Sequence, residues 1–133
     1  MNREQASVLK EEVALSIQEI ATDTTTVGEI IDTRGFDAQT FIIQAGTLAD
    51  GSYLPSIVEG DDSALSDESA VADADLTTTE VLATVDESDE IKKIGYKGSK
   101  RYIRCDIVSS ATDSGGDIGV ISIKGLPANA PVA

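Results

Sequence analysis

The chain has 133 residues, which suits a single domain, and 41% of them are apolar, which is enough to form a core. Ten Lys and Arg residues accompany 24 Asp and Glu, and the net charge of -14 argues against nucleic acid as a partner, because phosphate binding needs a basic face. The N-terminus is charged, and the apolar runs are shorter than the ~20 residues of a membrane span, so we expect no membrane partner.

The first twenty residues are ambiguous. Their apolar positions fit helical spacing, but Val13, Leu15 and Ile17 also alternate as they would in a strand. We interpret residues 1–12 as a flexible N-terminal arm and expect the first strand at Val13–Ile20. Residues 13–126 then form a single β domain. Residues 127–133 form an extended C-terminal tail, because Pro127 and Pro131 disfavour regular structure.

Two segments rich in β-branched residues follow a Thr-rich loop. TVGEIID (residues 26–32) and TFIIQAGTL (residues 40–48) both predict strands. The Asp50-Gly51 pair after the second segment favours a two-residue hairpin turn, since such turns need positive φ angles. That turn would pair Leu48 with Tyr53.

An acidic region separates these strands from the rest of the chain. Residues 60–75 predict a long surface loop with one helical turn, held to the core by Leu65 and Val71, and TTTEVLATV (residues 77–85) predicts a further strand. The acidic runs could offer oxygen ligands to Ca²⁺, but neither matches an EF-hand loop. We therefore interpret the acidic runs as solvated loops without a metal site. Weak cation binding is the alternative.

Positive charge is concentrated in the next segment. KKIGYKGSKRYIRC (residues 92–105) holds six of the ten basic residues, whereas Gly35 to Ile91 contains no Lys or Arg. The pattern predicts a short strand, a turn at Lys97-Gly98 and a long strand that buries Cys105 as a free thiol. A last strand follows, in which Ile121 and Ile123 are expected to be buried.

The concentration of basic residues has two interpretations. The cations balance acidic loops of the same subunit, or they dock on an acidic neighbour, such as another copy of the chain. Arg34, in DTRGF, has a similar choice between a turn pair with Asp32 or Asp37 and a partner contact. We take four basic residues as candidates for partner contact: Arg34, Lys97, Lys100 and Arg101.

These elements predict an all-β protein. The fold class is an antiparallel β-sandwich or barrel, jelly-roll-like, with six to eight strands, long polar loops and extended termini. The chain has no His, its single Cys has no His partner, and no nucleophile elbow or phosphate-binding loop is present. We therefore expect no enzyme activity, no catalytic residue and no cofactor.

Three segments resemble a known family. The stretches TTTVGEIIDTRGFDAQTFIIQAGTLADGSY, IKKIGYKGSKRYIRCDIV and LPANAPV are similar to a family of small structural proteins of tailed bacteriophages, over roughly Thr24 to Val132. Genes of that family tend to lie near the major capsid gene. The resemblance thus implies a decoration or cement protein, made in the host cytoplasm and placed on the capsid exterior.

The resemblance also implies partners. They are the major capsid protein and copies of the chain itself, with a trimer at local threefold axes of the capsid as one arrangement. Two rival functions stay open: a head–tail connector or tail component, and a carbohydrate-binding β-sandwich at the host surface. The low aromatic content of 4% counts against the carbohydrate-binding module.

Overall fold

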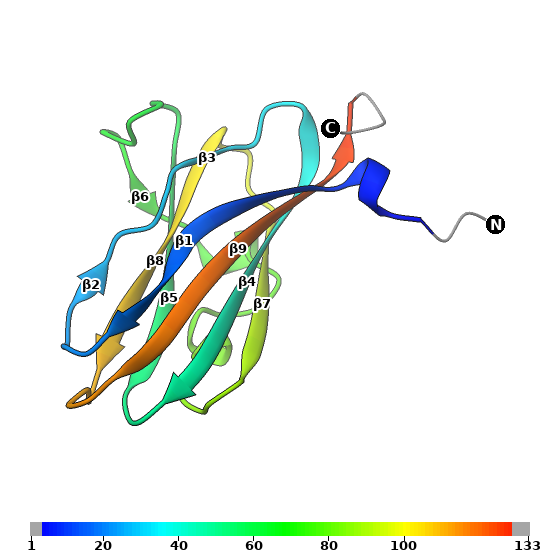
Figure 1. Cartoon of the computed structure of the whole chain (residues 1–133). Helices are drawn as coiled ribbons and strands as arrows, with labels where there is room; N and C mark the ends of the chain where they lie inside the picture. Colours follow the sequence, from blue (N-terminus) through cyan, green and yellow to red (C-terminus); the bar gives the residue numbers. More distant parts are fainter. Residues whose placement is uncertain (1–3, 129–133) are drawn as a thin grey trace.

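The computed structural model describes residues 4–128 and has the form of a two-layer antiparallel β-sandwich (Figure 1). The first sheet has the strand order β1 (Lys10–Ile20), β9 (Gly116–Pro127), β4 (Phe36–Leu48) and β7 (Ile91–Tyr96). The second sheet has the order β2 (Thr25–Thr26), β8 (Tyr102–Ser110), β5 (Ser52–Gly60) and β6 (Ser69–Ala70), and β3 (Ile31–Asp32) also pairs with β8. Short 3-10 turns lie at Ala6–Val8, Asp73–Asp75 and Val81–Ala83.

The all-β sandwich class is confirmed, and both sheets have open edges, so they do not close into a barrel. Nine strands are present in the described part of the chain, and three of them have only two residues each. The first strand begins at Lys10, earlier than expected, because residues 10–12 pair with β9 in register. Residues 129–133 of the expected tail lie outside the described residues.

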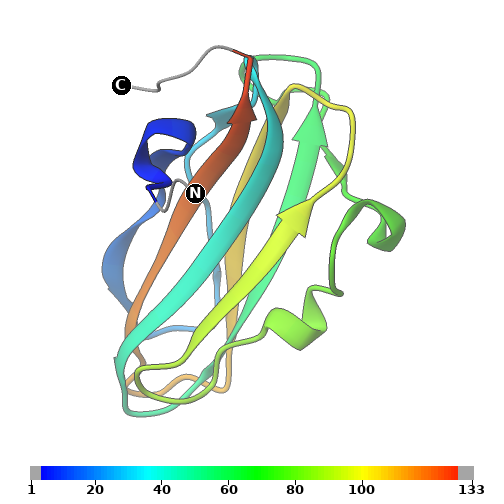
Figure 2. The same ribbon diagram turned by 90° about the vertical axis from the view of Figure 1, so that its right-hand side faces the viewer.

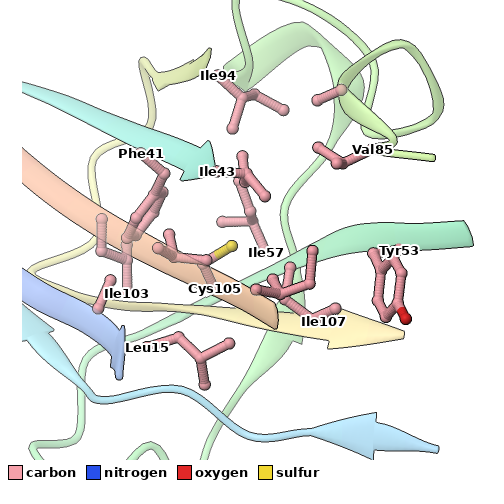
Figure 3. Close-up of a cluster of buried hydrophobic side chains, with 14 of the residues drawn as sticks. Leu15, Phe41, Ile43, Tyr53, Ile57, Val85, Ile94, Ile103, Cys105 and Ile107 are labelled. Atoms are coloured by element: carbon pink, nitrogen blue, oxygen red, sulfur yellow. The ribbon is translucent and has the colours of Figure 1, made fainter. Parts of the chain in front are cut away.

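The core lies between the sheets and consists of residues that alternate along the long strands (Figure 3). Phe41 and Ile43 of β4 face Ile103 and Ile107 of β8, and all four are fully buried. Cys105 lies among them with no exposed surface, as expected for a free thiol. Burial raises the pKa of this thiol, because the thiolate would be cut off from water.

The strand expected at residues 26–32 is interrupted. Residues 25–26 and 31–32 pair with β8, but the segment between them leaves the second sheet and the Glu29 N–H donates to the Ala14 carbonyl of β1, 2.7 Å away. Gly28 makes this crossing feasible, since a Cβ there would lie 2.3 Å from the Cys105 carbonyl oxygen and 2.6 Å from that of Ala14. The segment thus links the two sheets along one edge.

Both expected hairpins are wrong. Asp50-Gly51 is a turn, with Gly51 at φ +97°, but it joins β4 of the first sheet to β5 of the second. Leu48 therefore pairs with Gly116 and Tyr53 pairs with Ser109. The Lys97-Gly98 region likewise carries the chain from β7 to β8, across the sandwich. Gly51 has the expected positive φ but Asp50 does not, and the pairing of distant strands decides the sheet.

Two further expectations are wrong. Residues 77–85 form a 3-10 turn with an isolated bridge at Val85 instead of a strand, and the side chains of Thr79 and Glu80 accept backbone N–H groups there. On β9, Ile121 faces outward and is 39% exposed, while Ser122 is fully buried and accepts a hydrogen bond from Gln39. The acidic loop agrees with expectation, since Leu65 and Val71 are buried.

Candidate docking site

A cleft of about 490 Å³ opens at one end of the sandwich. It lies where the β3–β4 connection meets the β7–β8 connection, and we call this the cleft end. Figure 2 shows both connections at the same end as the last residues of β9. Its wall includes Arg34, Phe36, Gln39, Lys100 and Arg101.

The cleft joins the three segments that carry the family resemblance. The Thr33 N–H and hydroxyl both donate to the carbonyl of Arg101, at 2.9 and 2.8 Å, which ties the first segment to the second. The Ala128 N–H donates to the Gly35 carbonyl at 2.8 Å, which ties the third segment to the first. Gly35 has φ +90°, a conformation that favours glycine, so the tight turn depends on this residue.

Asp32 and Arg101 form the central ion pair of the site. The Nε and Nη2 atoms of Arg101 donate to the two carboxylate oxygens of Asp32, each at 2.8 Å, in a bidentate arrangement. The hydrogen bonds from Arg101 are the main reason why the pKa of Asp32 falls to about 2. The Arg34 N–H also donates to Asp32 at 3.0 Å, so this carboxylate fixes the turn as well.

Lys100 is held by an ion pair with Asp61 and by a hydrogen bond to the buried hydroxyl of Tyr96. Its ammonium lies 2.8 Å from Asp61, and its N–H donates to the Tyr96 hydroxyl at 3.0 Å. The Tyr96 hydroxyl in turn donates to Glu59 at 2.9 Å. Burial is the main reason why the pKa of Tyr96 is raised, so the hydroxyl stays a donor at all ordinary pH values.

Lys124 closes the inner side of the site. Its ammonium pairs with Glu12 at 2.5 Å, donates to the carbonyl of Asp32 at 3.0 Å and lies 5.1 Å from the centre of the Phe36 ring. With only 6% of its surface exposed, Lys124 is a structural cation that anchors β9 to the β3–β4 connection. No sequence pattern indicates this role, because Glu12 and Asp32 are both remote from Lys124 in the chain.

The four candidate contact residues have different environments. Lys100 and Arg101 are paired with carboxylates of the same chain. The guanidinium of Arg34 and the ammonium of Lys97 have no ion-pair partner within residues 4–128, so the turn pair of Arg34 with Asp32 involves its backbone N–H alone. Arg34, in the β3–β4 connection, lines the cleft, whereas Lys97, in the β7–β8 connection, lies outside the cleft wall.

Gln39 adds a polar group to the cleft wall. Its Nε2 donates to Ser122 at 2.8 Å, but within the described chain its Oε1 atom has no hydrogen-bond partner. The guanidinium of Arg34 and the carboxylate of Asp37 both line the cleft without an ion-pair partner in residues 4–128, beside the paired Lys100 and Arg101. The Arg34 guanidinium suits a carboxylate of a protein segment, because Arg binds a carboxylate in two-point geometry.

Within residues 4–128, no group of three His, Cys, Asp or Glu side chains is arranged to hold a metal ion. Among the same residues, no helix has the length and apolar character needed to cross a membrane.

No family model and no curated protein sequence matches the chain. Solved structures with a similar fold do exist. The prophage-derived protein YomS of SPBc2 matches with a TM-score of 0.53 and 13% identity, over 87% of this chain and 91% of YomS. The PBSX exported protein XepA matches with a TM-score of 0.54 and 16% identity, over 87% of this chain but only 37% of XepA. These likenesses establish a common fold.

Proposed function

We propose that the chain is a virion structural protein of a tailed bacteriophage, and that it decorates the exterior of the capsid. The observation that carries the proposal is the meeting of the three family-like segments at one cleft, where the Arg34 guanidinium has no ion-pair partner among the described residues 4–128. The fold that the chain has in common with two prophage proteins supports the same origin.

The physical properties of the domain suit a passive role. A decoration protein needs a rigid β core, high solubility before docking and surfaces that grip neighbouring capsomers. The continuous core between the sheets meets the first need, and the net charge of -14 meets the second. Many weak contacts to a repeated lattice then add up through multivalency. In this role the cleft end binds an acidic segment of the major capsid protein, and Arg34 is the main contact.

A binding assay with capsid shells tests the proposal. The purified protein is incubated with mature-size shells that lack it, the shells are sedimented, and bound copies are counted. Saturable binding at hundreds of copies, with a raised melting temperature of the shells, is the expected result. Binding at about a dozen copies would replace decoration with a connector role at a vertex, because copy number follows the symmetry of the site. The absence of binding would reject the capsid role.

A matched pair of variants tests the cleft. Arg34→Gln removes one unpaired positive charge at the cleft end, and we expect it to weaken shell binding at least tenfold. Glu87→Gln removes one exposed negative charge at the opposite end and should bind as the wild type does. Equal binding by both variants would show that the cleft end does not face the shell.

A further inference from the structure

The outward face of the first sheet carries an apolar surface that the core does not use. Ile17 is 80% exposed, Ile91 60% and Val13 58%, although all three lie in strands of this sheet. Figure 1 views this face directly, with β1, β9, β4 and β7 side by side. Large apolar side chains gathered on one face of a soluble protein indicate an interaction surface.

Strand register shows how these side chains are arranged. Val13 lies opposite Ile121 of β9, Ile121 lies opposite Ile42 of β4, and Ile42 lies opposite Lys93 of β7. The four residues therefore form one row across the whole sheet, apolar except for the lysine at its β7 end. We call this row the apolar row.

A neighbouring row contains a groove. Gly119 of β9 has no side chain, and Ile17 lies over it, since a Cβ on Gly119 would come within 2.7 Å of the Ile17 Cγ1 atom. The groove of about 470 Å³ runs beside Ile17 and is lined largely by the apolar residues of β1 and β9. Ile91 stands at the β7 end of the same row, because it pairs with Gln44.

Charges of opposite sign lie at the two edges of this face. On the β1 side the exposed Glu11 flanks the apolar row, whereas on the β7 side the row ends in the exposed Lys93. Within residues 4–128, neither Glu11 nor Lys93 has an ion-pair partner. The face therefore has an acidic edge and a basic edge with apolar residues between them, which makes it complementary to itself.

We propose that this face binds the same face of a second copy, around a two-fold axis that runs parallel to the strands. This axis lays β1 of one copy over β7 of the other. Ile42 then packs on Ile121 of the second copy, Ile91 comes next to Ile17, and Lys93 reaches the Glu11 side of the row. Each contact occurs twice, as a two-fold interface requires.

The charge pattern selects this axis over the alternative. A two-fold axis across the strands would place each strand over its own copy, with Lys93 against Lys93. Like charges brought together in an interface oppose association. The chosen axis avoids that clash and makes two complementary pairs.

The extent of the contact limits its strength. Glu19 and Asp117 form an acidic row beyond Ile17, so the contact ends there. A face four strands wide and a few rows long buries on the order of 1,000 Å² in total, which is the lower bound for a specific interface. We therefore expect a weak dimer that strengthens as salt screens the net charge of -14, since apolar contacts are not screened. The dimer goes beyond the proposed capsid role, because it forms whether or not a shell is bound.

Cross-linking tests the geometry. Val13→Cys and Lys93→Cys are prepared as separate variants, mixed at high concentration and treated with a short bis-maleimide linker. Within one copy the two positions are three strand spacings apart, about 14 Å, so the linker joins them only between copies. The native Cys105 is buried, and wild-type protein serves as the control for its reaction.

The expected product is a covalent dimer in the mixture and none from either variant alone. The double variant should give only closed dimers, without larger products. Product from Val13→Cys alone would establish the other axis, and a ladder of products from the double variant would establish head-to-tail stacking. Cross-linking only to the shell protein on particles, or to nothing, would overturn the second copy as the occupant.

Sedimentation equilibrium provides a second measurement with a matched control. Ile17→Asp places a charge on the proposed face, and Val81→Asp places one on an equally exposed apolar residue, 71% exposed, in the turn Val81–Ala83. We expect Ile17→Asp to weaken dimerisation at least tenfold and Val81→Asp to leave it unchanged. Equal effects of the two substitutions would overturn the proposal, and shell binding by both variants would report separately on the capsid role.

Discussion

The two ends of the sandwich use their carboxylates differently. At the cleft end, Asp32 and Asp61 pair with Arg101 and Lys100. At the opposite end, which we call the distal end, the loops at residues 21–25, 49–51, 86–90 and 111–115 contain no Lys or Arg. There Asp50 accepts the N–H groups of residues 113, 114 and 115, at 3.0, 3.0 and 2.8 Å.

The distal end therefore stabilises its loops largely through backbone N–H groups, although Glu90 also lies 3.6 Å from the ammonium of Lys92. Asp23 acts in the same way, because the N–H and hydroxyl of Thr112 donate to it at 2.9 and 2.6 Å. A carboxylate that accepts several N–H groups needs no positive partner, since these dipoles favour its charged form. This explains how a chain with 24 acidic and ten basic residues folds compactly.

The largest expected effect is at the cleft end. Tyr96→Phe removes the hydroxyl that joins Glu59 to the Lys100 N–H, and leaves a nearly buried carboxylate without its donor. We expect the free energy of unfolding to fall by about 2 kcal/mol, because losing a hydrogen bond to a charged group costs more than losing a hydrogen bond to a neutral group. Urea denaturation measures the change. A loss below that of the next variant would contradict the comparison.

Tyr53→Phe is the matched change at the distal end. The Tyr53 hydroxyl is fully buried and donates to the carbonyl of Ile20 at 3.0 Å, a neutral acceptor. We therefore expect a smaller loss, about 1 kcal/mol, in the same urea experiment. A loss equal to that of Tyr96→Phe would show that the charge of the acceptor does not matter here.

Acid should weaken both ends, for different reasons. The pKa of Asp32 is lowered to about 2 by Arg101, and that of Asp50 is lowered by the N–H groups of residues 113–115. A carboxyl whose folded pKa lies below its unfolded value stabilises the fold above pH ~4, and this contribution is lost as pH falls through the folded pKa. Melting temperatures between pH 5 and pH 2 should therefore fall less steeply in Asp32→Asn and in Asp50→Asn than in the wild type. Slopes equal to that of the wild type would contradict the assigned causes.

Salt should act on the ion pair at the cleft end, and this effect is the smallest of the set. Arg101→Gln breaks an ion pair whose side chains are both 43% exposed, so we expect a small loss of stability that shrinks in molar NaCl. Arg34→Gln, which breaks no ion pair within residues 4–128, is the control and should change stability little. A salt-independent loss in Arg101→Gln would mean that packing against Tyr102, not charge, holds this residue.

The same comparison shows what the sequence could reveal. Strand positions followed from alternation in β4 and β8, and the burial of Cys105 followed from its apolar neighbours. The burial of Leu65 followed from its being a large apolar side chain in an otherwise polar loop. The partition into sheets did not follow, because Asp50-Gly51 has the same local chemistry whether the next strand pairs back or crosses to the other sheet. Hairpin signals describe a turn and leave the partner of each strand undetermined.

Only part of the candidate site could be predicted from the sequence. Of the four predicted contact residues, Arg34, Lys100 and Arg101 line one cleft, whereas Lys97 lies outside its wall. Their partners were not foreseen, since Asp32 lies 69 residues from Arg101 and Asp61 lies 39 residues from Lys100. The outward position of Ile121 was also missed, because alternation gives the period of a strand but not which face is buried.

The buried Cys105 is an intrinsic probe of how often the sandwich opens. Its sulfur lies between the sheets with no exposed surface, and its raised pKa keeps it as the unreactive thiol. An alkylating reagent reaches it only when the sheets separate, so the labelling rate counts opening events without any engineered probe. Comparing that rate for the free chain and for the chain on a particle would express docking as a change in how often the sandwich opens.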